Sequence, residues 1–411
     1  MELATYLICL SAFFTFINIR FLKLPSTIGL MILALVLSVF VQVSGFISAD
    51  FLVAAKQFVA DMDFQDVLLK LMLSFLLFAG AMQIDLRVLR EEKWPVLVLA
   101  TVGTLLSTFI VAFLTYYILP VIGLEVPLMH CLLFGALISP TDPIAVLALV
   151  KKFNVSKNLE IKIAGESLFN DGVGVVVFLT LLSIAGFGHG GHDFGAMDVV
   201  TLFGQEVIGG VALGCLLGWG GFWLLEEIDN SHTELEVLVT LSLVMGGSLI
   251  AEALHLSAPL AMVVLGLFLS NQGRSEGKEQ ATGEYVYKFW HLMDETLNAV
   301  LFILIGLEMI LIPFSGTNLL AGVLAVFIVL TGRFMGVATP IKLLLFKRKF
   351  QEGTISILTW GGLRGGISVA LALSLPDGTF KNIILTMTYT VVVFSILVQG
   401  LTIPKLIKRF H

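Results

Sequence analysis

The chain has 411 residues, of which 57% are hydrophobic and 13% are charged. Soluble domains carry about 25% charged residues, so this composition excludes a soluble globular protein and predicts an all-α polytopic membrane protein. The formal net charge of −6 decides little, because in a membrane protein the distribution of charge matters more than its sum.

Thirteen apolar stretches follow one another along the chain, each near the roughly 17–25 residues that a membrane-spanning helix needs. The first should be a retained helix rather than a signal peptide, because Met1-Glu2-Leu3 has no basic character. The ninth is short and the eleventh long, so twelve or fourteen spans stay open. The predicted spans are 3–21, 26–44, 66–84, 95–119, 128–150, 160–185, 198–225, 234–253, 257–271, 294–313, 318–346, 353–375 and 382–404.

Lysine and arginine are distributed unevenly over the connections between these spans. When successive connections are assigned to opposite sides of the membrane, nineteen of the 24 basic residues fall on one side and only Lys56 and Lys381 on the other. The remaining three, Lys70, Arg333 and Arg364, lie within spans. Because cytoplasmic loops are enriched in Lys and Arg, the pattern predicts the N-terminus outside and the C-terminus in the cytoplasm.

The order of spans is that of a duplicated transporter. Spans one to six and eight to thirteen form two six-helix repeats of inverted orientation, joined by the seventh. Inverted repeats bind their substrate near the membrane midplane, where discontinuous helices meet. The fifth span of each set is interrupted, by Pro140 and Pro143 in the first and by Gly361 and Gly362 in the second.

The two prolines release the carbonyl groups of residues 136 and 139 from helical hydrogen bonds. Free carbonyls at membrane depth persist only where they line a cavity or bind something. Thr141 and Asp142 lie at this break. Asp142 has three possible roles: to coordinate a cation, to neutralise the N-terminal end of a half-helix, or to act as a structural cap.

The stretch from Ala164 to Gly172 contains the densest polar group inside a span. Ser167 and Asp171 are four residues apart and share a helical face with Asn170 beside them, which gives a set of hard oxygens suited to an alkali cation. Glu166 lies roughly 140° around the helix from Asp171. We therefore expect Asp171 to bind ions and Glu166 to pair with a cation.

Two arginines inside spans could provide that cation. Arg333 lies in the eleventh span and Arg364 at the glycine break of the twelfth, and a guanidinium can bind a carboxylate through two parallel hydrogen bonds. The residues alone do not choose between them. The remaining arginine would support the ends of the broken helices.

Four ordered motifs together resemble the monovalent cation:proton antiporter family, in its sodium/proton exchanger (NhaP-type) branch. They are Thr141-Asp142-Pro143, Gly165 to Gly172, Arg333, and Gly361 to Gly366. The resemblance implies an NhaA-like fold in which helices 5 and 12 are unwound and cross near the ion, a homodimer, and a Glu166–Arg333 ion pair. It implies that Asp171 binds cation and proton alternately, with Thr141, Asp142, Ser167 and Asn170 at the ion site.

The resemblance also predicts the domains. Residues 1–94 and 191–315 would form the dimerisation domain with its linker helix, and residues 95–190 and 316–411 the transport core. The protein would lie in a bacterial or archaeal inner (plasma) membrane.

The function expected is exchange of Na⁺ or Li⁺ for H⁺, with a stoichiometry of one to one because Asn170-Asp171 provides a single carboxylate where electrogenic relatives have two. The alternatives are K⁺/H⁺ exchange and, in another class, a cation channel or a non-transporting membrane sensor. We expect no enzyme, because no histidine base accompanies Ser167. No cofactor, no nucleic-acid partner and no metal beyond the transported cation are expected.

Overall fold

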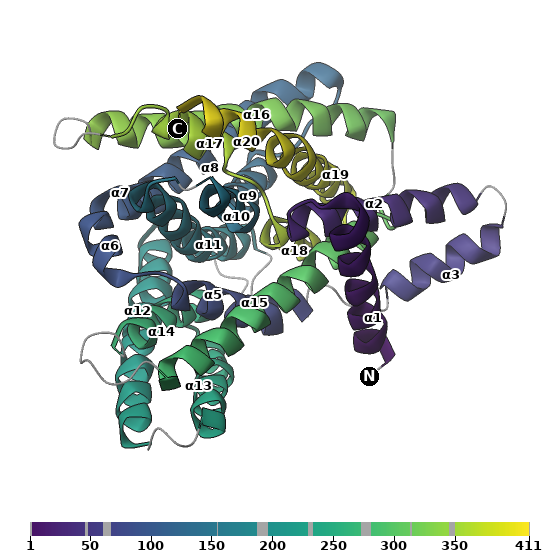
Figure 1. The fold of residues 1–411 in the computed structure, drawn as a ribbon. Helices are drawn as coiled ribbons and strands as arrows, with labels where there is room; N and C mark the ends of the chain where they lie inside the picture. Colours follow the sequence, from purple (N-terminus) through teal and green to yellow (C-terminus); the bar gives the residue numbers. More distant parts are fainter. Residues whose placement is uncertain are drawn as a thin grey trace. The chain divides into compact units, whose positions relative to one another are not determined.

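The computed structural model describes residues 2–45, 48–60, 67–153, 155–186, 196–228, 233–272, 281–312, 315–344 and 350–410. All elements in these ranges are helices (Figure 1), and extended pairing is limited to one isolated bridge between Asp142 and Leu363. The all-helical prediction is confirmed for this part of the chain.

The first half of the chain contains both long helices and short, interrupted ones. Its elements are α1 (Glu2–Ile17), η1 (Asn18–Leu22), α2 (Ser26–Ser44), α3 (Ala49–Ala60), η2 (Val67–Met72), α5 (Leu73–Met82), α6 (Leu86–Glu91), α7 (Lys93–Val98), η3 (Leu99–Gly103), α8 (Thr104–Ile118), η4 (Leu119–Ile122), α9 (Leu128–Ile138), α10 (Ile144–Lys152) and α11 (Lys157–Ile184).

The second half begins with long helices and ends with interrupted ones. Its elements are α12 (Ala196–Glu227), α13 (Thr233–Ala253), α14 (Ala258–Gln272), α15 (Ala281–Glu308), α16 (Gly316–Leu344), α17 (Thr354–Trp360), α18 (Gly366–Leu373), α19 (Thr379–Phe394), η5 (Ser395–Gln399) and α20 (Gly400–Phe410). The segments η1, η2, η3 and η5 are π-helical.

Every predicted span overlaps between one and four observed helical segments. Among the described residues, nine helices are long and apolar enough to cross a membrane, and three shorter apolar helices cover Val67–Met82, Leu128–Ile138 and Ala258–Ser270. The predicted span 128–150 is divided into α9 and α10, and the span 353–375 into α17 and α18. Segment 51–63 is not among the candidate spans: α3 covers its first ten residues.

One predicted span begins in the wrong place. The stretch 294–313 is the second part of α15, which starts at Ala281 and ends at Glu308. Charged residues in the first turns of this helix hid its true beginning. Asp294, where the predicted span began, lies further along the same helix, and its carboxylate accepts a hydrogen bond of 2.8 Å from Gln83 of α5.

The helices form two compact units, each built from separate stretches of the chain. Unit 1 consists of Met1–Leu68, Leu105–Ser156 and Asn298–His411, and unit 2 of Leu69–Thr104 and Lys157–Leu297. These divisions follow contacts within the chain. The predicted domains, defined by their roles in transport and with other boundaries, stay a prediction.

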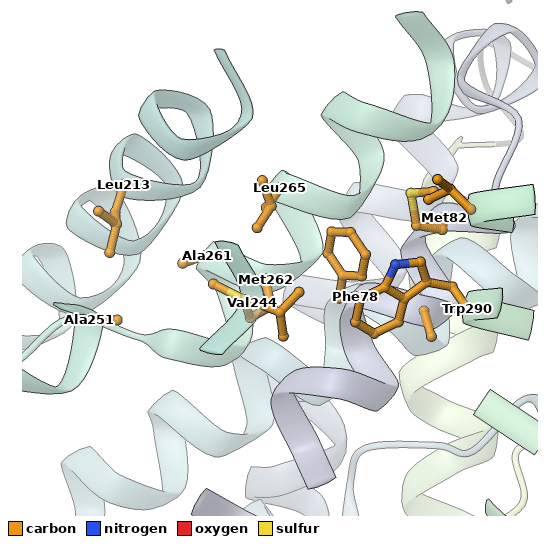
Figure 2. Close-up of a cluster of buried hydrophobic side chains, with 11 residues drawn as sticks. Phe78, Met82, Leu213, Val244, Ala251, Ala261, Met262, Leu265 and Trp290 are labelled. Atoms are coloured by element: carbon orange, nitrogen blue, oxygen red, sulfur yellow. The ribbon is translucent and has the colours of Figure 1, made fainter. Parts of the chain in front are cut away.

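The core of unit 2 is a cluster of apolar side chains from α5, α12, α13, α14 and α15 (Figure 2). Phe78 packs edge-on against Trp290 with ring centroids 4.5 Å apart. The buried indole N–H of Trp290 donates a hydrogen bond of 3.0 Å to Thr240 Oγ1, so the polar atom of this large side chain is satisfied. Beside it, α12 and α14 approach closely: a Cβ on Gly214 would lie 2.5 Å from the Ala261 carbonyl oxygen.

In unit 1 the interrupted helices pack on two long elements. Helix α16 contacts α17 and α19, and α18 contacts α9 and α19. Helix α20 contacts α10 and α17. Both helix breaks therefore lie inside this unit, held from outside by α16 and by the run α19–η5–α20.

Candidate functional site

The first helix break lies between α9, which ends at Ile138, and α10, which begins at Ile144. The carbonyl oxygens of Ser139 and Pro140 accept hydrogen bonds from Arg364 Nη1 at 2.5 and 2.7 Å. Arg364 is 2% exposed. A buried guanidinium thus binds carbonyl groups at the C-terminal end of a half-helix, where a positive charge is favourable.

Asp142 closes the same break from the other side. Its backbone N–H donates to the Leu363 carbonyl at 2.8 Å, and its Oδ1 accepts from the Ile144 N–H at 2.9 Å. The carboxylate therefore caps the beginning of α10, where the helix dipole favours a negative charge. Thr141 beside it is buried.

The second break lies between α17, which ends at Trp360, and α18, which begins at Gly366. A Cβ on Gly362 would lie 2.5 Å from Arg333 Nε, and a Cβ on Gly365 would lie 2.5 Å from Asp142 Oδ2. Glycine is favoured at both positions, because a larger residue would force the side chain of Arg333 or Asp142 to shift.

Arg333 of α16 binds the end of α17. Its Nε and Nη2 both donate to the Leu358 carbonyl, at 3.2 and 3.0 Å, and the side chain is buried. Each broken helix therefore has an arginine on carbonyl groups near the end of its first half: Arg364 for α9 and Arg333 for α17.

The π-helical turn η5 holds the second break in place, a contribution that the sequence did not predict. Ser395 Oγ accepts from the Arg364 backbone N–H at 3.0 Å, and Gln399 Nε2 donates to the Trp360 carbonyl at 3.0 Å. The Trp360 indole N–H donates in turn to Thr402 Oγ1 at 2.8 Å. The available signal was the pair Ser395 and Gln399, four residues apart in an apolar span.

A small cavity of about 10 Å³ adjoins these groups, roughly the space of one water molecule. Its polar lining comes from both arginines and Gln399, and apolar residues of α16 and α19 form the remaining wall. The cavity leaves room for a single polar guest beside the guanidinium groups.

The third polar group lies on α11, in unit 2. Asn170 Nδ2 donates to Glu166 Oε1 at 3.4 Å, and Glu166, Ser167 and Asn170 are buried while Asp171 is partly exposed. Glu166 lies one helical turn before Asn170 on the same face of α11, and the Asn170 amide points toward it. Asn170 is also the residue directly before Asp171 in the sequence.

The predicted site residues thus fall into two groups. Unit 1 brings together Thr141, Asp142, Pro140, Pro143, Gly361, Gly362, Arg333 and Arg364, while unit 2 carries Glu166, Ser167, Asn170 and Asp171. Glu166 and Arg333 belong to different units, so their predicted ion pair stays a prediction. Within unit 1, a backbone bridge joins the two helix breaks, and each of the two arginines binds carbonyl groups at one break.

Three features together define a class of protein. They are broken helices that touch one another, buried arginines on the carbonyl groups of those helices, and a buried carboxylate, Glu166, on an apolar helix. Such irregular backbone at membrane depth is typical of secondary transporters. The chain is an integral multi-pass membrane protein of this class.

Comparison with known proteins identifies the family. The family model described as "Sodium/hydrogen exchanger, transmembrane" matches residues 8–409. The Na⁺/H⁺ antiporter NhaP of Pseudomonas aeruginosa is 47% identical over 416 residues, covering 100% of this chain and 97% of that protein. The Na⁺/H⁺ antiporter NhaH of Halobacillus dabanensis is 34% identical over 397 residues, covering 95% and 93%.

A solved structure shares the fold. The sodium proton antiporter MjNhaP1 of Methanocaldococcus jannaschii, solved at pH 8, aligns over 100% of this chain and 99% of its own with a TM-score of 0.78 at 19% identity. The chain belongs to the sodium/hydrogen exchanger family and is NhaP-type, a family of transporters rather than enzymes.

Proposed function

We propose that this protein is a secondary antiporter that exchanges Na⁺, or Li⁺, for H⁺ across the membrane with a stoichiometry of one to one. The observation that carries the proposal is the full-length 47% identity to a protein named as a Na⁺/H⁺ antiporter, together with the buried Glu166 and the partly exposed Asp171 on α11. The broken helices, with their carbonyl groups held by Arg333 and Arg364, support alternating access.

Asp171 is the residue that we propose to bind the cation and the proton in competition. Ser167, on the same face of α11, and Thr141 and Asp142 at the first break supply the other oxygens, with Asn170 beside them. One carboxylate holds either one proton or one monovalent cation, so each turnover moves equal charge in both directions. A core with an empty, charged Asp171 would carry an unpaired charge through the membrane interior, which is costly.

The wider architecture is proposed on the same basis. About thirteen spans form two inverted repeats, with the unwound helices crossing at the ion site. Residues 95–190 and 316–411 form the transport core, and residues 1–94 and 191–315 the dimerisation domain of a homodimer. The N-terminus lies outside and the C-terminus in the cytoplasm of a bacterial or archaeal plasma membrane, and Glu166 pairs with Arg333.

The test uses proteoliposomes with an acidic interior and a trapped fluorescent pH reporter. Addition of Na⁺ or Li⁺ should make the interior alkaline at a rate independent of a clamped membrane potential. Asp171→Asn should abolish the response while keeping the wild-type thermal unfolding temperature. Asp377→Asn is the matched control, because Asp377 is fully exposed and outside the spans.

Each other outcome points to a defined correction. A response to K⁺ alone would keep the mechanism and change the cation. A rate that follows the membrane potential would contradict the one-to-one stoichiometry. Exchange retained by folded Asp171→Asn would remove Asp171 from its central role, and no response to any cation would favour a channel or a sensor.

A further inference from the structure

A buried ion pair lies at the beginning of α11, and none of the roles assigned above uses it. Lys162 Nζ and Glu92 Oε1 are 3.0 Å apart, and their side chains are only 11% and 10% exposed. Both residues belong to unit 2. By contrast, the ion pair between Lys381 and Asp377 in unit 1 has an Asp377 side chain that is 99% exposed.

Glu92 lies at the joint between α6 and α7. The backbone leaves helical geometry there (φ −102°, ψ 13°) and α7 resumes at Lys93. Helix α11 contacts α6, α7 and η3. A Cβ on Gly165 would lie 3.0 Å from Val96 and 3.2 Å from Leu89, so the joint packs directly against the turn of α11 that precedes Glu166.

Lys162 begins a polar stripe on α11 that leads to the proposed ion site. Lys162, Glu166 and Asn170 follow one another at intervals of four residues, so they share one helical face. All three are buried, and Asn170 donates to Glu166. The stripe ends next to Asp171 in sequence, so a rotation or shift of α11 at Lys162 would be transmitted rigidly to Asp171, nine residues further along one unbroken helix.

Packing alone does not require charge at this joint. Removing two charges from water is costly, and replacing a buried ion pair by apolar residues of similar volume is often neutral or stabilising. Two apolar residues would also pack in several rotations of α11, whereas a 3.0 Å contact between Lys162 and Glu92 fixes one. Orientation of α11 is therefore the contribution that an ion pair makes here and an apolar pair would not.

We propose that Glu92 and Lys162 are positioning residues for the cation site: their ion pair fixes the rotation and height of α11 on the α6–α7 joint and so holds Asp171 in its ion-binding geometry. The inference rests on the proposed function. In metal sites, outer partners that orient a ligand are worth about 10–100-fold in affinity. We expect loss of the pair to raise the apparent KM for Na⁺ about tenfold, with a smaller change in the maximal rate.

The experiment compares the wild-type protein with three variants in the same proteoliposomes. The double variant Glu92→Leu/Lys162→Met removes both charges and leaves neither one buried alone. Lys162→Arg keeps the charge and can re-form the pair. Lys381→Met is the matched control, because it removes an ion pair with an exposed partner. Apparent KM, maximal rate and thermal unfolding temperature are measured for each.

We expect the double variant to unfold near the wild-type temperature and to show the raised KM, while Lys162→Arg recovers most of the affinity and Lys381→Met matches wild type. A folded double variant with a KM within twofold of wild type would overturn the inference. Failure of both the double variant and Lys162→Arg to fold would also overturn it, because the pair would then serve folding alone. Absence of exchange in the wild-type protein would instead refute the proposed function.

Discussion

Gly365 shows how a single residue allows two broken helices to touch. Because Gly365 has no side chain, the carboxylate of Asp142 fits beside it. The backbone N–H of Asp142 donates to the carbonyl of Leu363, two residues before Gly365. Asp142 caps α10 at the same time. A side chain at position 365 would therefore disturb the contact between the breaks and the cap of α10 together.

We expect Gly365→Ala to destabilise the protein by about 1–3 kcal/mol, the usual cost of overpacking a buried site, and to slow cation exchange. The measurement is thermal unfolding in detergent together with the exchange rate in proteoliposomes. Gly316→Ala is the control: its new methyl group would meet no atom within 4 Å, so its stability should change by less than about 0.5 kcal/mol. Equal stability and exchange in both variants would show that the Asp142 contact tolerates a side chain.

The residues that are expensive in a membrane can be read from the sequence, but the backbone acceptors that bind the two buried arginines cannot. Arg333 and Arg364 were both assigned as candidate partners of Glu166, because a buried guanidinium is expected to find a carboxylate. The structure shows each arginine on backbone carbonyl groups. Carbonyl acceptors carry no sequence signature, since every residue has one, and only the helix breaks release them.

At the scale of the elements, the run α19–η5–α20 supports the second break. Ser395, the first residue of the π-helical turn, accepts from the Arg364 backbone N–H and donates to the Val392 carbonyl at 2.9 Å. The π turn thus connects a long helix with the residue whose side chain binds Ser139 and Pro140.

Ser395→Ala should leave the buried N–H of Arg364 without this acceptor, at a cost of about 1–3 kcal/mol. We expect a lower unfolding temperature and slower exchange. Ser374→Ala is the matched control, because Ser374 Oγ donates only to the Leu371 carbonyl of its own helix. The role of the π turn would be contradicted if both serine variants unfolded at the same temperature.

Element breaks were predictable, whereas the π turns were not. Pro140, Pro143 and the glycines from 361 to 366 mark the two interruptions because proline lacks a donor and glycine tolerates close approach. The π turn at 395–399 contains Ser, Ile, Leu, Val and Gln, residues that an α-helix accepts equally well. Tertiary hydrogen bonds to the break, rather than local preference, select it.

For the whole molecule, hydropathy sufficed for the class of fold because a span must satisfy its backbone groups internally. The division into units 1 and 2 was not predictable. It depends on which apolar helix faces pack against each other, and apolar side chains do not specify a partner. The predicted orientation depends on the positions of lysine and arginine. It is open to a direct test with residues exposed at opposite ends of α9 and α10.

Single cysteines at Glu125 and Lys151, both exposed, should react from opposite sides of the membrane. The background must lack Cys9, Cys131 and Cys215. In intact cells, a membrane-impermeant maleimide should label Glu125→Cys, while Lys151→Cys should react only after the membrane is opened. The reverse pattern would invert the orientation, and labelling of both from outside would mean that 128–150 does not cross the membrane.

The π turn at 395–399 also sets the angular phase of the C-terminal helix. Gly400, Ile403 and Ile407 face inward on α20, while Lys405, Lys408 and Arg409 face outward. An α-helix closes each turn with i→i+4 hydrogen bonds and advances by about 100° per residue, whereas a π turn closes with i→i+5 bonds, so residues 395–399 accommodate one residue more than an α turn would. A one-residue deletion within 395–399 can therefore be absorbed by a return to α-helix that keeps Ile403 and Ile407 facing inward, whereas a one-residue deletion inside α20 itself would rotate its later residues by about 100°.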